Sequence, residues 1–291
     1  PANALSAVII TSLPAAGTLK LSGTNVTLNQ SIAVASLGNL VYAPAANANG
    51  NAYASFGFKV QDNGGTANGG VDTSVSSNTI TVNVTSVNDA PTGANKTVTV
   101  LEDGSYTFAS SDFGFADTSD SPANALSAVI ITSLPAAGTL KLSGTSVTLN
   151  QSISAANIGN LVYAPAANAN GLAYASFNFK VKDDGGTANG GVDTSVSSNT
   201  ITVNVTSVND APTGADKTVT VLEDGSYTFT ATDFGFADTS DSPANSLSAV
   251  IITSLPAAGA LKLSGTSVTL NQSISAANIG NLVYEIGRAH V

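Results

Sequence analysis

Oxygen-bearing side chains gather in a few turns of this sequence, and they are of the kinds that bind calcium. Asn88 and Asp89 lie in the segment Ser-Val-Asn-Asp-Ala-Pro-Thr-Gly, and Asn209 and Asp210 lie in a second copy of it. In proteins Ca²⁺ takes about six to eight oxygen ligands from carboxylates, amides and main-chain carbonyls. These residues could therefore ligate calcium, or they could simply stabilise turns, as Asn and Asp often do. Both interpretations stay open.

Other turns carry more candidate ligands of the same chemistry. They are Glu102, Asp103, Asp112, Asp117, Asp183, Asp184, Glu223 and Asp224. For each of them the alternative is a plain turn or a solvated loop residue. In an antiparallel fold some of these turns lie at the same end of a domain, so ligands that are distant in sequence could meet. Calcium is the only cofactor that the sequence suggests.

The sequence has no complete set of residues for a catalytic site or for another kind of binding site. The chain has no Cys, so thiol catalysis, Cys metal sites and disulfides are excluded. Its single His is His290, and it has no Gly-rich phosphate loop. The adjacent carboxylates of Glu102 and Asp103 cannot flank a glycosidic bond from opposite sides. We therefore predict that the protein is not an enzyme.

The elements that must position these residues repeat along the chain. Asn88 and Asn209 lie 121 residues apart, a period typical of tandem domains rather than of solenoids. Residues 1–91 are predicted to be the C-terminal part of a truncated repeat, 92–212 a complete repeat, and 213–284 the N-terminal part of a third. Residues 285–291 depart from the repeat and are predicted to be a translated sequencing-adapter artefact. For that reason His290 and Arg288 are not candidate site residues.

Alternating apolar and polar residues predict short strands, as in 199–207. Within the complete repeat the expected strands are 97–101, 106–109, 126–132, 138–142, 146–149, 160–164, 173–182 and 199–207. A turn at 102–105 separates the first two, and residues 152–158 are the one place where a helical turn is expected. Many short strands with turn signals between them are typical of an antiparallel β-sandwich. The predicted fold class is all-β, with tandem β-sandwich modules.

Charge narrows the range of partners. The chain contains 9 Lys and Arg residues against 19 Asp and Glu residues, for a net charge of −10. Such an acidic surface repels phosphate backbones and anionic lipids. No apolar run is long enough to span a bilayer. We therefore expect no nucleic-acid partner and no membrane insertion of this segment.

Several motifs together resemble the cadherin-like, immunoglobulin-like tandem repeats of large bacterial RTX-type surface adhesins. They are Val208-Asn209-Asp210-Ala211-Pro212, Leu222-Glu223-Asp224-Gly225, Ala231-Thr232-Asp233-Phe234, residues 160–168 and residues 179–186. The resemblance covers nearly the whole chain apart from residues 285–291. It implies an immunoglobulin-like sandwich, secretion to the cell surface or the extracellular space, and calcium held near the joints. Cadherin joints proper begin with Asp, where Ser207 stands here, and they carry a second Asn.

The function expected from these features is that of a noncatalytic extracellular repeat, a calcium-stiffened spacer that contributes to cell adhesion. Its expected partners are the neighbouring repeats of the same chain, with other cells or extracellular matrix beyond them. The alternative is a carbohydrate- or matrix-binding array without calcium, which exposed Tyr163, Tyr174 and Tyr227 would favour. Because residues 1–91 lack the first two strands, we also expect an exposed sheet edge and low stability there.

Overall fold

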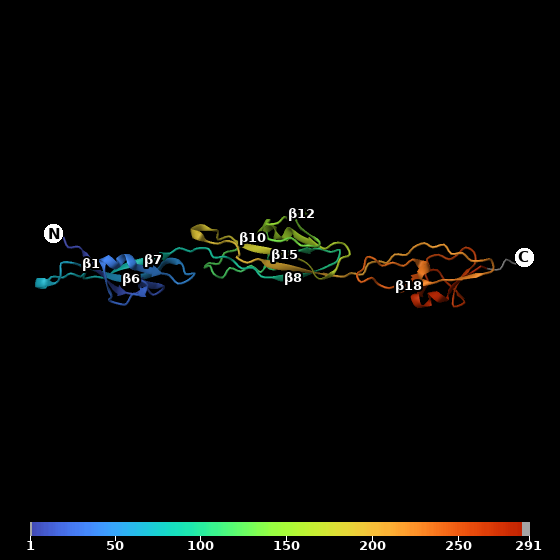
Figure 1. Cartoon of the computed structure of the whole chain (residues 1–291), viewed down its shortest axis with the longest axis horizontal. Coiled ribbons are helices and arrows are strands. Elements are labelled where there is room, and N and C mark those ends of the chain that lie inside the picture. The colour runs from blue at the N-terminus through green and yellow to red at the C-terminus, as the bar shows by residue number, and fades with distance from the viewer. Residues whose placement is uncertain (1, 287–291) are drawn as a thin grey trace.

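Strands form where apolar residues alternate with Thr, Ser and Asn. In β16 (Asn199–Thr206) the side chains of Ile201, Val203 and Val205 are buried, and the residues between them are partly exposed. The computed structural model describes residues 2–286. Its strands fall into three bodies that follow one another along one long axis (Figure 1). We call them module 1 (2–91), module 2 (92–212) and module 3 (213–286).

Module 2 is a sandwich of two sheets. One sheet has five strands in the order β13-β10-β15-β16-β8, and the other has four in the order β12-β11-β14-β9. The remaining strands are β8 (Lys96–Leu101), β9 (Tyr106–Thr107), β10 (Leu126–Ile131), β11 (Thr139–Leu142), β12 (Thr145–Ser146), β13 (Ser152–Ser154), β14 (Leu161–Ala164) and β15 (Gly171–Asp183). All strand pairs in it are antiparallel except β16 with β8, which run parallel. The predicted all-β sandwich fold is confirmed.

Two local features differ from the expected pattern. β8 and β9 belong to different sheets, because β8 pairs with β16 and β9 pairs with β14. The turn at 102–105 therefore carries the chain across the sandwich. The helical turn expected within 152–158 is present as the 3-10 helix η4 (Ala155–Asn160), which follows β13. A further 3-10 helix, η3 (Ser110–Phe113), was not expected.

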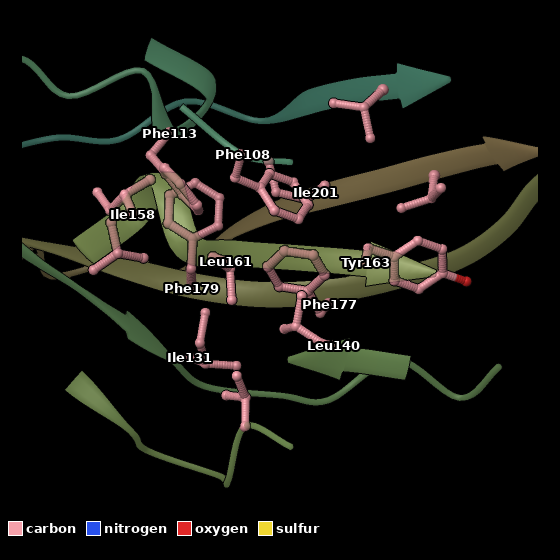
Figure 2. Packing of buried hydrophobic residues seen from close by; sticks show 14 of the residues in the cluster. Phe108, Phe113, Ile131, Leu140, Ile158, Leu161, Tyr163, Phe177, Phe179 and Ile201 are labelled. Atoms are coloured by element: carbon pink, nitrogen blue, oxygen red, sulfur yellow. The ribbon is translucent and has the colours of Figure 1, made fainter. Parts of the chain in front are cut away.

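The core of module 2 lies between the two sheets (Figure 2). Phe177 and Phe179 of β15 point inward and are fully buried. Phe177 meets Phe108 edge to face with ring centroids 5.5 Å apart, and Phe179 meets Phe113 in the same way at 4.9 Å. Such aromatic pairs contribute beyond the area they bury. This rigid core holds the turns at both ends of the module in place.

Modules 1 and 3 contain parts of the same sandwich. The sheets of module 1 are β4-β1-β6-β7 and β3-β2-β5, and those of module 3 are β17-β22-β19-β20 and β18-β21. The strands of module 1 are β1 (Leu5–Ser12), β2 (Thr18–Leu21), β3 (Thr24–Asn25), β4 (Ser31–Ala33), β5 (Leu40–Ala43), β6 (Gly50–Asp62) and β7 (Asn78–Val84). Those of module 3 are β17 (Ser226–Thr228), β18 (Ala249–Ile251), β19 (Ala260–Leu263), β20 (Thr266–Ser267), β21 (Ser273–Ser275) and β22 (Leu282–Glu285).

The outer edge of β7 is exposed, as expected for residues 1–91. Ile80 of β7 is 44% exposed, whereas Ile201, its equivalent in module 2, is 0% exposed because β8 covers that edge. Residues 217–222 have the sequence of β8 but form no regular strand. An alternating pattern needs a ladder partner, and residues 2–286 contain none for this segment. No helix in this range is long and apolar enough to cross a membrane.

Candidate metal centre at the module joints

The residues between modules form two joints, joint 1 (86–93) and joint 2 (207–214). The preceding strands end before the joints, β7 at Val84 and β16 at Thr206, and the proline of Asp-Ala-Pro keeps each strand from resuming because it has no N–H to donate to a β-ladder. Thr92 then exchanges two backbone hydrogen bonds with Ala116, both 2.8 Å long. Thr213 and Ala237 do the same in module 3. Each joint is therefore tied to the loop of the following module that carries Asp117 or its equivalent Asp238.

In joint 1, Asn88 is held by the end of β15 and by the loop that follows β15 in module 2. Its Nδ2 donates to Asp183 Oδ1 at 3.1 Å and to the Val192 carbonyl at 2.8 Å. The backbone N–H of Val192 donates in turn to the Asn88 carbonyl at 2.8 Å. Asp183 ends β15, so the loop that follows β15 folds back onto the joint. Sequence positions about a hundred residues apart thus meet at one end of the sandwich.

The loop after η3 supplies the other acidic groups of joint 1. The backbone N–H of Asp89 donates to Asp120 Oδ2 at 3.0 Å. Asn124 bridges the two segments, since its backbone N–H donates to Asp117 Oδ2 and its Nδ2 donates to Asn88 Oδ1. Carboxylates from this loop, the joint and the end of β15 therefore surround one small region.

Two carboxylate oxygens in this region are buried without a partner. They are Oδ1 of Asp117 and Oδ2 of Asp183, and the Asp183 residue is only 1% exposed. Burial raises the pKa of Asp183, and the charges of Asp117 and Asp193 raise it further, against hydrogen bonds from Gly185 and Asn88. Burial also raises the pKa of Asp120, with the charges of Asp117 and Asp89 adding to the effect. A buried charge without a compensating partner destabilises the folded state.

Joint 2 repeats this arrangement with the residues of module 3. The backbone N–H of Asp210 donates to Asp241 Oδ1 at 3.0 Å, and Asn245 Nδ2 donates to Asn209 Oδ1 at 2.6 Å. Oδ2 of Asp210 and Oδ1 of Asp238 are buried without a partner. Burial raises the pKa of Asp210, and four nearby carboxylates raise it further, namely Asp103, Asp241, Glu102 and Asp238.

Glu102 and Asp103 bring module 2 into joint 2. Glu102 is 3% exposed and accepts hydrogen bonds from Asn170 Nδ2 at 3.0 Å, the Ser207 hydroxyl at 3.2 Å and the Val208 backbone N–H. These bonds, that of Asn170 first, lower the pKa of Glu102 against the opposing effect of burial. Oδ1 of Asp103 accepts from the Asn168 backbone N–H at 3.0 Å. Joint 2 therefore receives carboxyl groups from both of its modules.

The structure does not bring Asp112 to either joint. Its Oδ1 accepts from Lys96 Nζ at 2.6 Å, and its Oδ2 accepts from the Tyr106 hydroxyl at 3.2 Å and the Ala109 backbone N–H at 2.8 Å. Both oxygens are thus occupied in capping η3 and pairing with lysine. Asp233 has the same role with Lys217 in module 3. We therefore do not include Asp112 in the candidate site.

Three other candidates are exposed, and two of them lie away from both joints. Asp184 is exposed, and its Oδ1 accepts from the Ala125 backbone N–H at 2.8 Å. Glu223 and Asp224 are exposed in the module 3 turn that reaches Ile286, whose N–H lies 3.5 Å from the Gly225 carbonyl. They therefore lie at the opposite end of module 3 from joint 2.

Sequence reasoning missed several residues that the structure brings to the joints. They are Asp120, Asn124, Asn168 and Asn170 of module 2, together with Asp241 and Asn245 of module 3. All of them recur with the 121-residue period, but so do their neighbours, so recurrence alone could not single them out.

The residues at the joints fit a calcium ion by their chemistry. Each candidate ligand offers a side-chain oxygen atom, and four of the buried carboxylate oxygens have no hydrogen-bond partner. Within residues 2–286, no three His, Cys, Asp or Glu side chains form a ready-made metal cluster. At the joints, the amides of Asn88, Asn124 and Asn245 stand between the acidic groups. The candidate ligand set is therefore a mixture of carboxylates and amides, which suits Ca²⁺.

The comparison with family models agrees with the sandwich fold. The sequence pattern of a family described as a bacterial Ig domain (Big_9) matches residues 88–206, which include Asn88 and Asp89 of joint 1 and nearly all of module 2. The crystal structure of human mucin-like protocadherin EC1-2 is 15% identical, with a TM-score of 0.34, and the match covers 69% of this chain and 84% of that one. No curated protein matches the chain. Module 2 is thus an immunoglobulin-like β-sandwich similar to bacterial Ig domains.

Proposed function

We propose that this chain is a noncatalytic extracellular repeat of a large bacterial adhesin of the RTX type. In this proposal it is secreted to the cell surface and acts as a calcium-stiffened spacer that contributes to cell adhesion. Its immediate partners are the neighbouring repeats of the same chain. Other cells or extracellular matrix are contacted through the assembly of which it is part.

One observation carries the proposal: carboxylate oxygens are buried without partners at both joints. Asp117 and Asp183 provide them at joint 1, and Asp210 and Asp238 at joint 2. A buried ionised oxygen with no hydrogen bond is destabilising unless a cation or a proton neutralises it. Unpartnered carboxylate oxygens occur at both joints, and Asp117 and Asp238 are equivalent residues. The feature therefore does not depend on the conformation of a single loop.

At joint 2, residues of three segments would hold the ion. They are Glu102 and Asp103 from module 2, Asn209 and Asp210 from the joint, and Asp238 and Asp241 from module 3. When bound, Ca²⁺ would supply the positive charge that offsets repulsion among these carboxylates. Because the groups belong to two modules, offsetting their repulsion would also fix the angle between the modules. Extracellular modules bind calcium with dissociation constants of about 10⁻⁴ to 10⁻³ M, which suits a rod that stiffens outside the cell.

Calcium titration of the whole chain tests the proposal. Thermal unfolding and small-angle X-ray scattering would be followed together, because stiffening must change both stability and shape. We expect millimolar Ca²⁺ to raise the melting temperature and to narrow the distribution of particle lengths. The variant Asp210→Ala should lose this response at joint 2. Asp216→Ala is the matched control, since Asp216 is also acidic and close by but is exposed.

An unchanged melting temperature and an unchanged scattering profile at millimolar Ca²⁺ would refute the calcium-stiffened spacer. The carbohydrate-binding alternative would then be tested by glycan binding. The positions of the tyrosines do not favour that alternative. Tyr163 is fully buried, with its hydroxyl donating to the Ala137 carbonyl at 3.0 Å, and Tyr174 packs against the core. The Tyr227 hydroxyl is bonded to Asp233.

A further inference from the structure

The first and last strands of module 2 lie side by side and run in the same direction. β8 pairs with β16 in a parallel ladder that extends from Lys96 opposite Ile201 to Leu101 opposite Thr206. Figure 2 shows the two strands as arrows that point the same way across the core. The ladder therefore joins the strand by which the chain enters module 2 to the strand by which it leaves.

Tension along the chain loads this ladder in shear. Module 1 leads into the start of β8 through joint 1, and module 3 follows the end of β16 through joint 2 (Figure 1). Pulling the two outer modules apart draws the parallel strands in opposite directions along their own length. The hydrogen bonds of a parallel ladder are evenly spaced, so they share such a load. Strands that are peeled apart from one end instead lose their bonds one after another.

Glu102 closes the ladder at the end where module 3 pulls. Its backbone N–H donates to the Thr206 carbonyl at 2.9 Å. Its Oε1 accepts from the Ser207 hydroxyl at 3.2 Å and from the Val208 backbone N–H, and its Oε2 accepts from Asn170 Nδ2 at 3.0 Å. Hydrogen bonds to a carboxylate are roughly twice as strong as neutral ones. The turn after β8 therefore grips the chain just beyond the end of β16.

Asn95 closes the ladder at the end where module 1 pulls. Its Oδ1 accepts from the Thr200 backbone N–H at 2.8 Å and from Asn199 Nδ2 at 3.3 Å. The next residue, Lys96, pairs through Nζ with Oδ1 of the buried Asp112 at 2.6 Å. The start of β8 is thus fixed both to β16 and to η3. Side chains reinforce both points at which tension enters the module.

Packing of β8 against the core also opposes sliding. Val98 and Val100 face the core and are buried, whereas Thr97 and Thr99 are exposed on the other face. Moving a strand by one residue along its partner exchanges its two faces. Sliding of β8 would therefore carry threonines towards the core and valines towards solvent. The hydrophobic effect opposes this movement in addition to the hydrogen bonds.

We propose that the β8–β16 ladder is the load-bearing element of module 2, with Glu102 and Asn95 as latches that keep its two ends closed under tension. The ladder would let the module pass a pulling force from one neighbour to the other without unfolding. This role goes beyond that of a calcium-stiffened spacer, because residues of module 2 itself make every bond in the ladder and the latches. It requires neither calcium nor a ligand.

The direction of pulling tests the proposal in the full chain. Because the chain has no Cys, handles can be attached at introduced thiols. Ala94→Cys/Val208→Cys places the handles beyond opposite ends of the ladder and loads it in shear. Ala94→Cys/Ser198→Cys places both handles at the start of the ladder and peels it open. All three residues are exposed, and in both variants modules 1 and 3 hang outside the loaded segment.

Optical tweezers would measure the unfolding force of module 2 in both directions. We expect a force several-fold higher in shear than in peeling. Glu102→Ala should lower the shear force and leave the peeling force unchanged, because peeling begins at the other end of the ladder. Asn95→Ala should lower both forces. Thr99→Ala is the matched control, since its exposed side chain lies on β8 between the two latches.

Equal unfolding forces in the two directions would overturn the load-bearing ladder. A change of both forces alike in Glu102→Ala, or of neither, would overturn the latch. Ser207→Ala is a milder variant that removes one bond to Glu102 and keeps the carboxylate, and it should lower the shear force by a smaller amount. Circular dichroism shows whether each variant is folded. A calcium chelator would be present throughout, so that this result is independent of the calcium titration.

Discussion

Asn88 in joint 1 donates a hydrogen bond from Nδ2 to Asp183 Oδ1, 95 residues further along the chain, at 3.1 Å. Asp183 ends the longest strand of module 2, so the core that fixes this strand also fixes the position of the joint. The second oxygen of Asp183 is buried and unpartnered. The same carboxylate thus anchors the joint and leaves a buried negative charge beside it.

Replacing Asp183 with Asn should separate these two roles. The variant Asp183→Asn removes the charge and keeps the size of the side chain. We expect it to be at least as stable as the parent in calcium-free buffer, and to lose the stabilisation that calcium gives joint 1. Hydrogen exchange of residues 86–93 with and without Ca²⁺ is the measurement.

Asp62→Asn provides the control for this prediction. Asp62 occupies the equivalent position in module 1 but lies opposite Leu5, at the end of that module away from joint 1. It should leave the calcium response of residues 86–93 intact. If Asp183→Asn retained the full response as well, Asp183 would not be a ligand.

The raised pKa values at the joints predict a pH dependence. Burial raises the pKa of Asp183 and of Asp210 above the usual value of 3.8. A carboxyl group whose pKa is raised by folding contributes stability fully below its unfolded pKa and loses it as pH rises through the folded pKa. In calcium-free buffer the joints should therefore weaken as pH rises from about 4 towards neutrality.

Hydrogen exchange of the two joints across this pH range checks the direction. Millimolar Ca²⁺ should abolish the weakening, because the cation takes the place of the proton. Asp183→Asn should flatten the trend at joint 1 and leave joint 2 unchanged. A joint that is most protected at neutral pH without calcium would contradict the prediction.

The Lys217–Asp233 pair in module 3 should show the opposite pH dependence. The hydrogen bond from Lys217, followed by that from the Thr230 backbone N–H, lowers the pKa of Asp233 to about 2. A carboxyl group whose pKa is lowered by folding stabilises the protein above its unfolded pKa, and this stability is lost as pH falls through the folded pKa. Module 3 should therefore lose stability between about pH 4 and pH 2.

Lys217→Met tests this pair with little change in side-chain length. The variant should be less stable at neutral pH, and its acid-induced loss should be smaller than that of the parent chain. Chemical unfolding of module 3 at several pH values is the measurement. Lys180→Met is a suitable control, because no ion pair of Lys180 is present in the structure of residues 2–286.

Much of the fold could be predicted because the strands follow a simple alternation. Phe177, Phe179 and Val181 fall on one face of β15 by sequence spacing alone, and all three are fully buried. What could not be predicted is how strands pair over long distances. β8 pairs with β16 in parallel, and residues 217–222 have the sequence of β8 but form no strand. The difference is that β8 has β16 to pair with. The local pattern of residues does not show whether such a partner is present.

The candidate site was predictable in its residue types and only partly in its membership. Asp112 and Asp117 are both loop aspartates by sequence, yet Asp112 pairs with Lys96 while Asp117 faces joint 1. The two residues differ in position only because the chain turns after η3, which leaves Asp112 beside Lys96 and carries Asp117 to the joint. Asp120 was missed because a loop rich in Asp and Ser gives no local signal for which carboxylate turns inward.

A glycine at the end of a turn should be essential to module 2. Gly138 has φ of 72°, and a Cβ there would lie 2.6 Å from the Ala164 carbonyl oxygen, beside the Tyr163 ring. Gly144 has φ of 82°, with open space around it. Gly144→Ala should therefore cost only the left-handed backbone penalty of about 1–2 kcal/mol, and Gly138→Ala should cost clearly more. Equal losses in chemical unfolding would mean that the contact with Ala164 relaxes freely.

Two isoleucines at equivalent positions allow the strand edge to be tested within one chain. Ile201 is 0% exposed beneath β8, and Ile80 is 44% exposed on the open edge of β7. In dilute solution Ile201→Ala should destabilise module 2 by about 2–5 kcal/mol, since it removes buried methylene groups and leaves a cavity. Ile80→Ala should destabilise module 1 by no more than about 1 kcal/mol. Hydrogen exchange followed by peptide mapping resolves the two modules, and similar losses at both positions would show that the β7 edge is covered in solution.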